Sequence, residues 1–267
     1  MQRTEKLRRT LGADARSIVD DIELFEVIDS TNSYLMRSSA PSPGRARLAI
    51  ADDQSHGRGR HDRHWETAPG SCLCLSLAYT FERTPEHLAV LTLLMGVAVA
   101  TVLSGIGLQR VRLKWPNDIV VDDAKLGGLL AETQLRPDRS VTVVAGVGIN
   151  LQIPPELSIR SSSTWAHAAT DLASCLPDAP ERDQLAAGIS DELLRVFRAF
   201  ETGETAAALT HWRRYDWLRG KRIRVDDGDN ATVGTAGGVD DEGLLLVETD
   251  SGVKRIFAGT ISLLSEA

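Results

Sequence analysis

The sequence predicts an α+β fold, in which a mixed or antiparallel sheet packs with helices and a small β-barrel follows at the C-terminus. Three patterns support this fold class. Short alternating apolar segments, typical of strands, recur as far as Leu151. An almost uninterrupted apolar run covers residues 88–103, and an apolar stripe with the helical period covers residues 181–200. Beyond Leu218, five short strands separated by turn residues are expected within about 50 residues.

The first part of the chain consists mainly of expected strands. Apolar residues alternate or run together in seven segments, at residues 22–28, 45–52, 71–80, 111–115, 119–121, 126–135 and 141–151. Side chains suited to a helix N-cap at residues 29–32 precede a short expected helix at 33–38. Residues 54–68 lack any apolar period, so we expect a loop there. The apolar run lies in a helix expected at residues 85–104, buried on most faces.

Helices and then short strands are expected in the last third of the chain. The stripe of the helix at 181–200 consists of Leu185, Ile189, Leu193, Phe197 and Phe200. Another helix is expected at residues 206–214. Four of the C-terminal strands are expected at residues 221–225, 231–237, 243–248 and 254–258, with Asp and Gly in the turns between them. The change of pattern predicts two domains, residues 1–217 and residues 218–267.

The composition excludes several classes of protein. A formal charge of −7 and a pI near 5.4 argue against a general nucleic-acid-binding protein, which would carry a basic face. Cys72, Cys74 and Cys175 are read as free thiols, the first two buried on one face of a strand. The N-terminal residues contain no apolar core of a signal peptide, so we expect a reducing, cytoplasmic location. The apolar run at 88–103 is shorter than the roughly 20 residues of a membrane span, and no membrane association is expected.

A glycine- and arginine-rich segment at residues 57–65 is the first candidate for a binding site. In an acidic chain, Arg58, Arg60 and Arg63 grouped together indicate an anionic ligand, because their forked donors suit carboxylate and phosphate. Gly57 and Gly59 permit unusual backbone conformations and a close approach of amide groups to a ligand. A solvated surface loop has the same composition, and this alternative stays open. Neither a dinucleotide-binding nor a P-loop pattern surrounds the segment.

Residues 114–128 form the second candidate segment, and they lie on expected strands. Lys125 precedes two glycines, whose missing side chains leave room for a ligand, and this favours a functional lysine. Lys114 fits a ligand contact or a solvent-facing position equally well. Asn117 and Asp118 are typical turn residues, so a structural role is their default. Asp118 alone is a poor Mg²⁺ site unless substrate phosphates supply the other ligands, so no metal site within the protein is predicted.

Together these motifs resemble the biotin protein ligases, that is, biotin–[acetyl-CoA-carboxylase] ligases. The resemblance runs from about Phe25 to the C-terminus and rests on Ser30-Thr31-Asn32, Gln54, GRGR, KWPND, KLGG and GVGIN, in that order. It implies a catalytic domain like those of class II aminoacyl-tRNA synthetases and an SH3-like C-terminal barrel. It also implies an ATP- and Mg²⁺-dependent enzyme that converts biotin to biotinyl-5′-AMP and then biotinylates one lysine of a biotin carboxyl carrier protein.

The resemblance also assigns roles to individual residues. Lys125 and Arg60 are the expected catalytic residues, with Lys125 bridging the biotin carboxylate and the α-phosphate. The expected biotin-binding residues are Ser30, Thr31, Asn32, Gln54, Gly57, Arg58, Gly59, Arg60, Lys125 and Gly128. The expected ATP-binding residues are Arg58, Arg60, Arg63, Trp65, Lys114, Asn117, Asp118, Lys125 and Asn150. For Trp65, stacking on the adenine and simple anchoring of the loop both remain open.

The sequence departs from the family pattern at some positions. Asp62 replaces a glycine of the arginine segment and should weaken its positive field, whereas Leu264 stands where relatives often have arginine. Two alternative functions remain, a lipoate–protein ligase and a non-catalytic biotin-binding regulator. Only 29 residues precede Ser30, and a winged helix-turn-helix needs about 60, so no sequence-specific DNA binding is expected. We expect a monomer or a weak homodimer.

Overall fold

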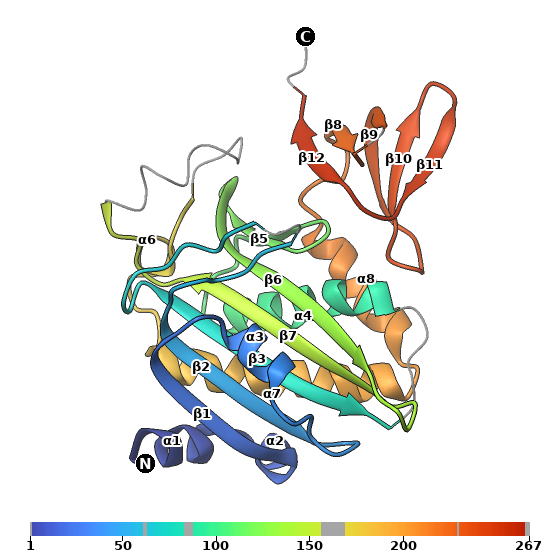
Figure 1. Cartoon of the computed structure of the whole chain (residues 1–267). Coiled ribbons are helices and arrows are strands. Elements are labelled where there is room, and N and C mark those ends of the chain that lie inside the picture. The colour runs from blue at the N-terminus through green and yellow to red at the C-terminus, as the bar shows by residue number, and fades with distance from the viewer. Residues whose placement is uncertain (1, 61–62, 83–87, 156–168, 229, 265–267) are drawn as a thin grey trace.

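The computed structural model describes residues 2–60, 63–82, 88–155, 169–228 and 230–264 (Figure 1). Its helices are α1 (Gln2–Thr10), α2 (Ala13–Ile18), α3 (Thr31–Arg37), α4 (Leu88–Gly105), α6 (Leu172–Cys175), α7 (Arg182–Glu201) and α8 (Thr205–Tyr215). The strands of the large sheet are β1 (Val19–Ile28), β2 (Ala46–Gln54), β3 (Cys72–Phe81), β4 (Val111–Lys114), β5 (Asp118–Val121), β6 (Ala124–Leu135) and β7 (Val141–Asn150). Those of the small sheet are β8 (Arg222–Asp226), β9 (Ala231–Val239), β10 (Leu245–Thr249), β11 (Gly252–Ile256) and β12 (Thr260–Leu263).

The large sheet has seven strands in the order β1-β2-β3-β7-β6-β5-β4. Strands β1 and β2 are parallel and the other neighbours are antiparallel, which confirms the predicted mixed sheet. A parallel pair needs a crossover connection, and α3 lies within it. The hairpin between β5 and β6 turns through Asp122 and Asp123, whose positive φ angles of 46° and 63° are those of a tight two-residue turn.

Helices cover both faces of the large sheet. Figure 1 shows α4 and α7 behind the sheet, and α3 in front of it. Strand β3 is an inner strand, between β2 and β7, and is buried along its whole length, because both of its faces are covered. Phe81 packs against Phe197 and Phe200 of α7, as the predicted stripe requires. Within the described residues, no helix is long and apolar enough to cross a membrane.

Helices α1, α2 and α6 are absent from the sequence prediction. Helix α1 is short and mostly charged, and it buries only Leu7 of its own residues. It is held by packing on α7 and β1, and by Arg3, whose guanidinium bonds both Asp52 and Asp183. Helix α3 begins two residues earlier than predicted, because Ser30 accepts the N-cap bond from the backbone amide of Ser33 at 3.4 Å. These helix ends depend on partners that are distant in sequence or on single caps.

The C-terminal unit is a five-stranded antiparallel sheet in the order β11-β10-β9-β8-β12. This sheet confirms the predicted small β domain. Five strands were expected but ranges were predicted for only four of them, and the fifth strand is β12. The unit rests on the large one through the Trp115 indole, which donates to the Gly243 carbonyl at 3.0 Å. Arg213 of α8 also bonds Asp241 at 2.9 Å. The domain boundary at 217/218 stays a prediction.

Asp216 lies at this junction between the two units, directly after α8. Its Oδ1 accepts from the Leu218 amide at 3.0 Å, whereas its Oδ2 is buried without a hydrogen-bond partner in the described structure. Burial raises the pKa of this carboxyl group to about 6, against the opposing effects of backbone hydrogen bonds and of Arg219 and Lys221. The charged form of Asp216 therefore weakens the junction at neutral pH.

Replacing this carboxylate should change how stability depends on pH. Because the pKa of Asp216 is higher in the folded chain than the ordinary 3.8, its ionisation lowers the free energy of unfolding as pH rises from about 4 to 7. We expect Asp216→Asn to gain stability relative to wild type over this window, by at most about 3 kcal/mol. Urea unfolding of both proteins at pH 4.5 and pH 7.5 measures this difference in the free energy of unfolding. A constant offset at both pH values contradicts the idea, and Asp241→Asn, 93% exposed, is the control.

Candidate functional site

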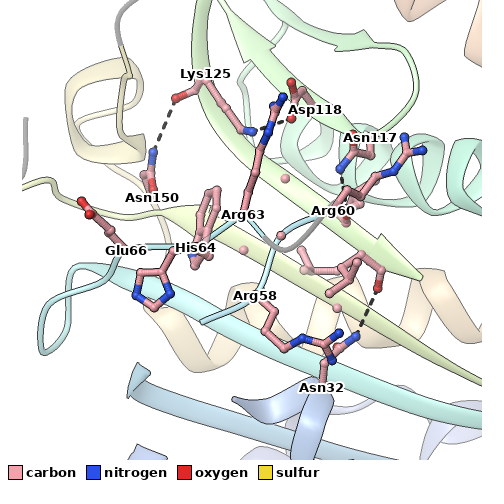
Figure 2. A pocket seen from close by; sticks show the side chains of 18 of the residues that line it. Asn32, Arg58, Arg60, Arg63, His64, Glu66, Asn117, Asp118, Lys125 and Asn150 are labelled. Atoms are coloured by element: carbon pink, nitrogen blue, oxygen red, sulfur yellow. Dashed lines mark hydrogen bonds and ion pairs between the residues drawn. The ribbon is translucent and has the colours of Figure 1, made fainter. Parts of the chain in front are cut away.

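A cavity of about 470 Å³ opens at the end of the large sheet, between the arginine segment, α3 and β12. This volume is in the range of small-molecule sites. Of the predicted site residues, those that line the cavity are Ser30, Thr31, Asn32, Gln54, Arg58, Gly59, Arg60, Arg63, Trp65, Lys114, Asn117, Asp118, Lys125, Gly128 and Asn150. Gly57 does not line it. Figure 2 shows how the side chains of the two sequence segments meet around one space.

The arginine segment is a loop closed by its own backbone. Arg58 and His64 form an antiparallel bridge, the Gly59 amide donates to the Arg63 carbonyl at 2.7 Å, and the Trp65 amide donates to Gly57 at 2.9 Å. Neither Gly57 nor Gly59 has a positive φ angle, so the expectation of unusual backbone dihedral angles at these glycines is wrong. A side chain at Gly57 would overlap the carbonyl of Trp65, so close backbone contact explains this glycine. Asp62 lies outside the described residues.

Trp65 ties this loop to the sheet. Its indole N–H faces the Cys72 sulfur at 3.4 Å, and its ring lies beside Gly148 of β7. The Lys125 ammonium lies 5.7 Å from the ring centroid, within reach of a cation–π interaction. These contacts show that Trp65 anchors the loop and also walls the cavity. Stacking of Trp65 on an adenine stays a prediction.

Positive charge is concentrated around the cavity. Among the described residues, five basic side chains line it, together with only two carboxylates, Glu66 and Asp118. Lys125 pairs with Asp118 at 2.5 Å. Burial lowers the pKa of Arg60, with Asp118 opposing this shift and Arg63 adding to it. Burial likewise lowers the pKa of Lys114, again opposed by Asp118. An anion bound here would relieve both effects, so the cavity favours anionic ligands.

The cations are divided between two ends of the cavity. Arg58 extends toward Asn32 and pairs with Glu132 at 2.9 Å (Figure 2). Arg60, by contrast, extends toward Asn117, and Lys125 toward Asp118. Arg58, Arg60 and Lys125 therefore line one cavity but do not meet at one point. The Asp118 end is the more basic of the two.

A buried polar network lies at the Arg58 end of the cavity. Gln54 Oε1 accepts from the Thr31 amide at 2.8 Å, the Thr31 and Ser76 hydroxyls are 2.7 Å apart, and the Ser76 hydroxyl donates to Asn32 Oδ1 at 2.6 Å. The Asn32 amide then donates to Glu132 at 3.0 Å. Ser76 and Glu132 are not among the site residues expected from the sequence. A serine inside the apolar strand at 71–80 was the available signal for the first, and Glu132 had none.

Two of the expected nucleotide residues hold the backbone in place. The Asn117 side chain donates to the Leu129 carbonyl at 2.8 Å, and the Asn150 side chain donates to Thr170 at 3.0 Å. This agrees with the default structural role of a turn residue for Asn117. Their expected contacts with ATP stay predictions.

The small C-terminal domain supplies part of the cavity wall. Residues 259–263 line it, the Arg63 guanidinium donates to Thr260 Oγ1 at 3.1 Å, and the Lys114 ammonium lies 3.4 Å from the Ile261 carbonyl. Leu264 is not part of the wall, and its amide bonds the Arg222 carbonyl at 3.0 Å. The contribution of this domain comes from the strand before the departure at Leu264, so the missing arginine does not remove it.

Metal-binding side chains are not grouped at the site. In the part of the chain that the structure describes, no three His, Cys, Asp or Glu residues are placed to hold a metal ion. Cys72 and Cys74 are buried free thiols, as predicted, and a hydrogen bond with Cys72 together with burial raises the pKa of Cys74. The Cys74 thiol therefore resists ionisation, so it suits packing better than chemistry.

Comparisons with known proteins define the class of protein to which this chain belongs. Residues 24–150 match the family model of the biotin/lipoate A/B protein ligase family, and residues 219–264 match that of the biotin protein ligase C-terminal domain. A solved structure of the biotin protein ligase from Aquifex aeolicus in complex with biotin and ATP superimposes with a TM-score of 0.75 at 25% identity, covering 92% of this chain and 100% of that one. The fold is thus that of a biotin or lipoate protein ligase.

Two curated relatives narrow this class. The bifunctional ligase/repressor BirA of Escherichia coli (strain K12) is 33% identical over 248 residues, which are 91% of this chain and 74% of that protein. The biotin–[acetyl-CoA-carboxylase] ligase of Mycobacterium tuberculosis (strain ATCC 25618 / H37Rv) is 30% identical over 240 residues, which are 87% and 85%. The chain belongs to the biotin protein ligase family and is a ligase.

Two glycines that pair across β6 and β7 provide a test of the site's packing. A Cβ atom on Gly148 would lie 2.7 Å from the Trp65 indole, whereas one on Gly128, its partner in register, would meet nothing closer than 3.6 Å. We expect Gly148→Ala to lower the free energy of unfolding by about 1–3 kcal/mol. The matched control Gly128→Ala should change it by less than about 1 kcal/mol. Equal urea unfolding curves for the two variants would show that Trp65 is not held against β7.

Proposed function

We propose that the protein activates biotin with ATP, forming biotinyl-5′-AMP and pyrophosphate, and then transfers the biotinyl group to a lysine of a biotin carboxyl carrier protein. The observation that carries this proposal is the single cavity that joins a polar, acceptor-rich end to a strongly basic end. The Aquifex aeolicus relative was solved with biotin and ATP, and the Mycobacterium tuberculosis relative is named for acetyl-CoA-carboxylase, which supports both substrates and the carrier.

Electrostatic repulsion makes the first step difficult, because a carboxylate must approach an anionic α-phosphate. We assign Lys125 and Arg60 to this task. An ammonium group has three N–H donors, so Lys125 can keep its bond to Asp118 while donating to a carboxylate oxygen and a phosphate oxygen. Each charge-assisted bond contributes roughly 1.5–3 kcal/mol. The carboxylate oxygen then bonds to the α-phosphorus as pyrophosphate leaves.

The polar end of the cavity fits the biotin ring. A ureido group has one carbonyl acceptor and two N–H donors, which match hydroxyl and amide side chains. We assign Ser30, Thr31, Asn32 and Gln54 to this ring. The loop backbone at Gly57 and Gly59, the Arg58 side chain and Gly128 complete the expected biotin contacts. The ring would then lie at one end, with its carboxylate directed toward Lys125.

The nucleotide belongs at the basic end. We assign Arg63, Trp65, Lys114, Asn117, Asp118 and Asn150 to ATP, together with Arg60 and Lys125. Arg58, also expected to contact ATP, lies at the polar end of the cavity, so its contact with ATP stays a prediction. Asp118 is the carboxylate among the basic groups, and one carboxylate suits a Mg²⁺ ion that arrives on the phosphates of ATP. When bound, this ion would neutralise part of the phosphate charge.

Biotinyl-5′-AMP is a mixed anhydride that water would hydrolyse, so the site must shelter it. The arginine loop and β12 enclose the cavity from two sides, and this arrangement can exclude solvent. In the second step the neutral amine of a carrier lysine attacks the anhydride carbonyl and AMP leaves. We propose a cytoplasmic location, where carrier domains and ATP are both present. The expectations of no sequence-specific DNA binding and of a monomer or weak homodimer stay predictions.

ATP–pyrophosphate exchange tests the first step. Purified protein with Mg-ATP and labelled pyrophosphate should exchange label when biotin is added, because adenylation is reversible. Lipoate should give no exchange above background. Exchange with lipoate and not with biotin would identify a lipoate–protein ligase, and biotin binding without exchange would identify a non-catalytic regulator. Addition of a biotin carrier domain should then yield one added biotinyl group on the carrier by mass spectrometry.

A matched pair of lysines tests the catalytic assignment. Lys125 pairs with Asp118 and lies near the Trp65 ring, whereas Lys221 pairs with Asp123 at 3.5 Å and lies over the Trp217 ring outside the cavity. Loss of two charge-assisted bonds should lower exchange by Lys125→Ala about a hundredfold or more. Lys221→Ala should exchange within about threefold of wild type. Wild-type exchange by a folded Lys125→Ala would refute the assigned role.

A further inference from the structure

Glu132 of β6 lies at the polar end of the cavity, where it joins two groups from other elements. Its carboxylate receives Arg58 Nη1 at 2.9 Å and Asn32 Nδ2 at 3.0 Å. The side chain of Glu132 is only 20% exposed, and Thr31, Asn32 and Ser76 are each at most 3% exposed. Bulk water therefore does not compete for the hydrogen bonds among Thr31, Asn32 and Ser76, and the directions of these bonds matter.

The direction of each bond in this network follows from the acceptors that face the Asn32 amide group, which are the Glu132 carboxylate at 3.0 Å and the more distant Leu130 carbonyl at 3.4 Å. An ionised carboxylate only accepts, so the atom of Asn32 that faces Glu132 must be the amide nitrogen. A flipped Asn32 would place its oxygen against a carboxylate oxygen. The amide oxygen of Asn32 therefore faces Ser76 and accepts the Ser76 hydroxyl proton at 2.6 Å.

The hydroxyl of Thr31 completes the chain. With its own proton donated to Asn32, Ser76 can only accept across the 2.7 Å contact with Thr31. The Thr31 hydroxyl proton therefore belongs to Ser76, while Gln54 Oε1 keeps the Thr31 backbone amide at 2.8 Å. The same proton has a second, more distant acceptor in Gln54 Oε1, 3.1 Å from the Thr31 hydroxyl, so both of its acceptors belong to the protein.

We propose that Glu132 is a specificity-determining residue that orients the hydroxyl protons of Thr31 and Ser76 away from the ligand. Both residues line the cavity, so they present oxygen lone pairs to whatever binds there. Lone pairs accept the N–H donors of a ureido ring and repel a ligand atom that has only lone pairs. This inference rests on the proposed function, since it explains how the site selects the ring of biotin.

The role of Glu132 is one of positioning, because its carboxylate bonds Arg58 and Asn32 and acts on the ligand through other residues. Glutamine at this position is isosteric but carries both a donor and an acceptor. Its amide could donate to a flipped Asn32, which would release the Ser76 and Thr31 protons to turn toward the ligand. The selectivity for N–H donors should then fall, even if the fold is unchanged.

The experiment compares two ligands by titration calorimetry with the full-length protein. One is biotin, and the other is an analogue with a ring oxygen in place of one ureido N–H. Wild type should bind biotin more tightly than the analogue. Glu132→Gln should reduce this preference about tenfold, mainly by weakening the binding of biotin. Exchange at saturating biotin should stay within about threefold, so that KM rises and kcat does not fall.

Two further variants separate this inference from simpler explanations. Ser76→Ala breaks the hydrogen-bond relay from Glu132 through Asn32 and Ser76 to Thr31, and it leaves Arg58 in place. If the relay sets the preference for biotin over the analogue, Ser76→Ala should reduce this preference. If Glu132 acts only by holding Arg58, Ser76→Ala should leave the preference unchanged. Ser76→Ala also tests the inference if Glu132→Gln does not fold. Glu192→Gln is the matched control, because Glu192 is 17% exposed and pairs with Arg195 away from the cavity.

Defined outcomes overturn the inference. Equal weakening of both ligands in Glu132→Gln would indicate a merely structural role, and unchanged biotin affinity would indicate none. A preference unaltered in Ser76→Ala would exclude the relay. Failure of wild type to bind biotin would instead refute the proposed function itself, which the exchange assay detects independently.

Discussion

Mutual repulsion among basic side chains around one cavity is the constraint on which the rest of the site depends. The chain is acidic overall, yet Arg58, Arg60, Arg63, Lys114 and Lys125 line the same space. Two carboxylates hold this charge in place without cancelling it. Asp118 pairs with Lys125 at the basic end, and Glu132 pairs with Arg58 at the polar end. The result is two ends with different chemistry, one suited to phosphates and one to a neutral polar ring.

Glycines in the large sheet give this arrangement its space. Strand β7 carries Gly146 beside Asn32 and Gly148 beside Trp65, so helix α3 and the arginine loop can both lie directly on the sheet. The loop thus has a firm floor although its own backbone bonds are few. This explains how a segment with no regular structure can present arginines at defined positions, which a binding site requires.

The small β domain belongs to the site as much as the sheet does. Residues 259–263 form one wall, and Arg63 reaches Thr260 across the space between the domains. The junction that sets this distance includes Asp216, whose buried carboxylate has a raised pKa. Binding at the cavity and the packing of the two domains are therefore linked physically.

The sequence by itself determined the α+β class, the apolar helix expected at residues 85–104 and found as α4, the stripe of α7 and the two basic segments, because these depend on local period and composition. All of the expected site residues except Gly57 line one cavity. These residues could be identified from the sequence because their motifs occur in a recognisable order. Tertiary structure alone decided helices α1 and α6, the roles of Ser76 and Glu132, and the separation of Arg58 from Lys125. Each of these depends on a partner from a distant strand or helix, and neither periodicity nor motif spacing contains that information.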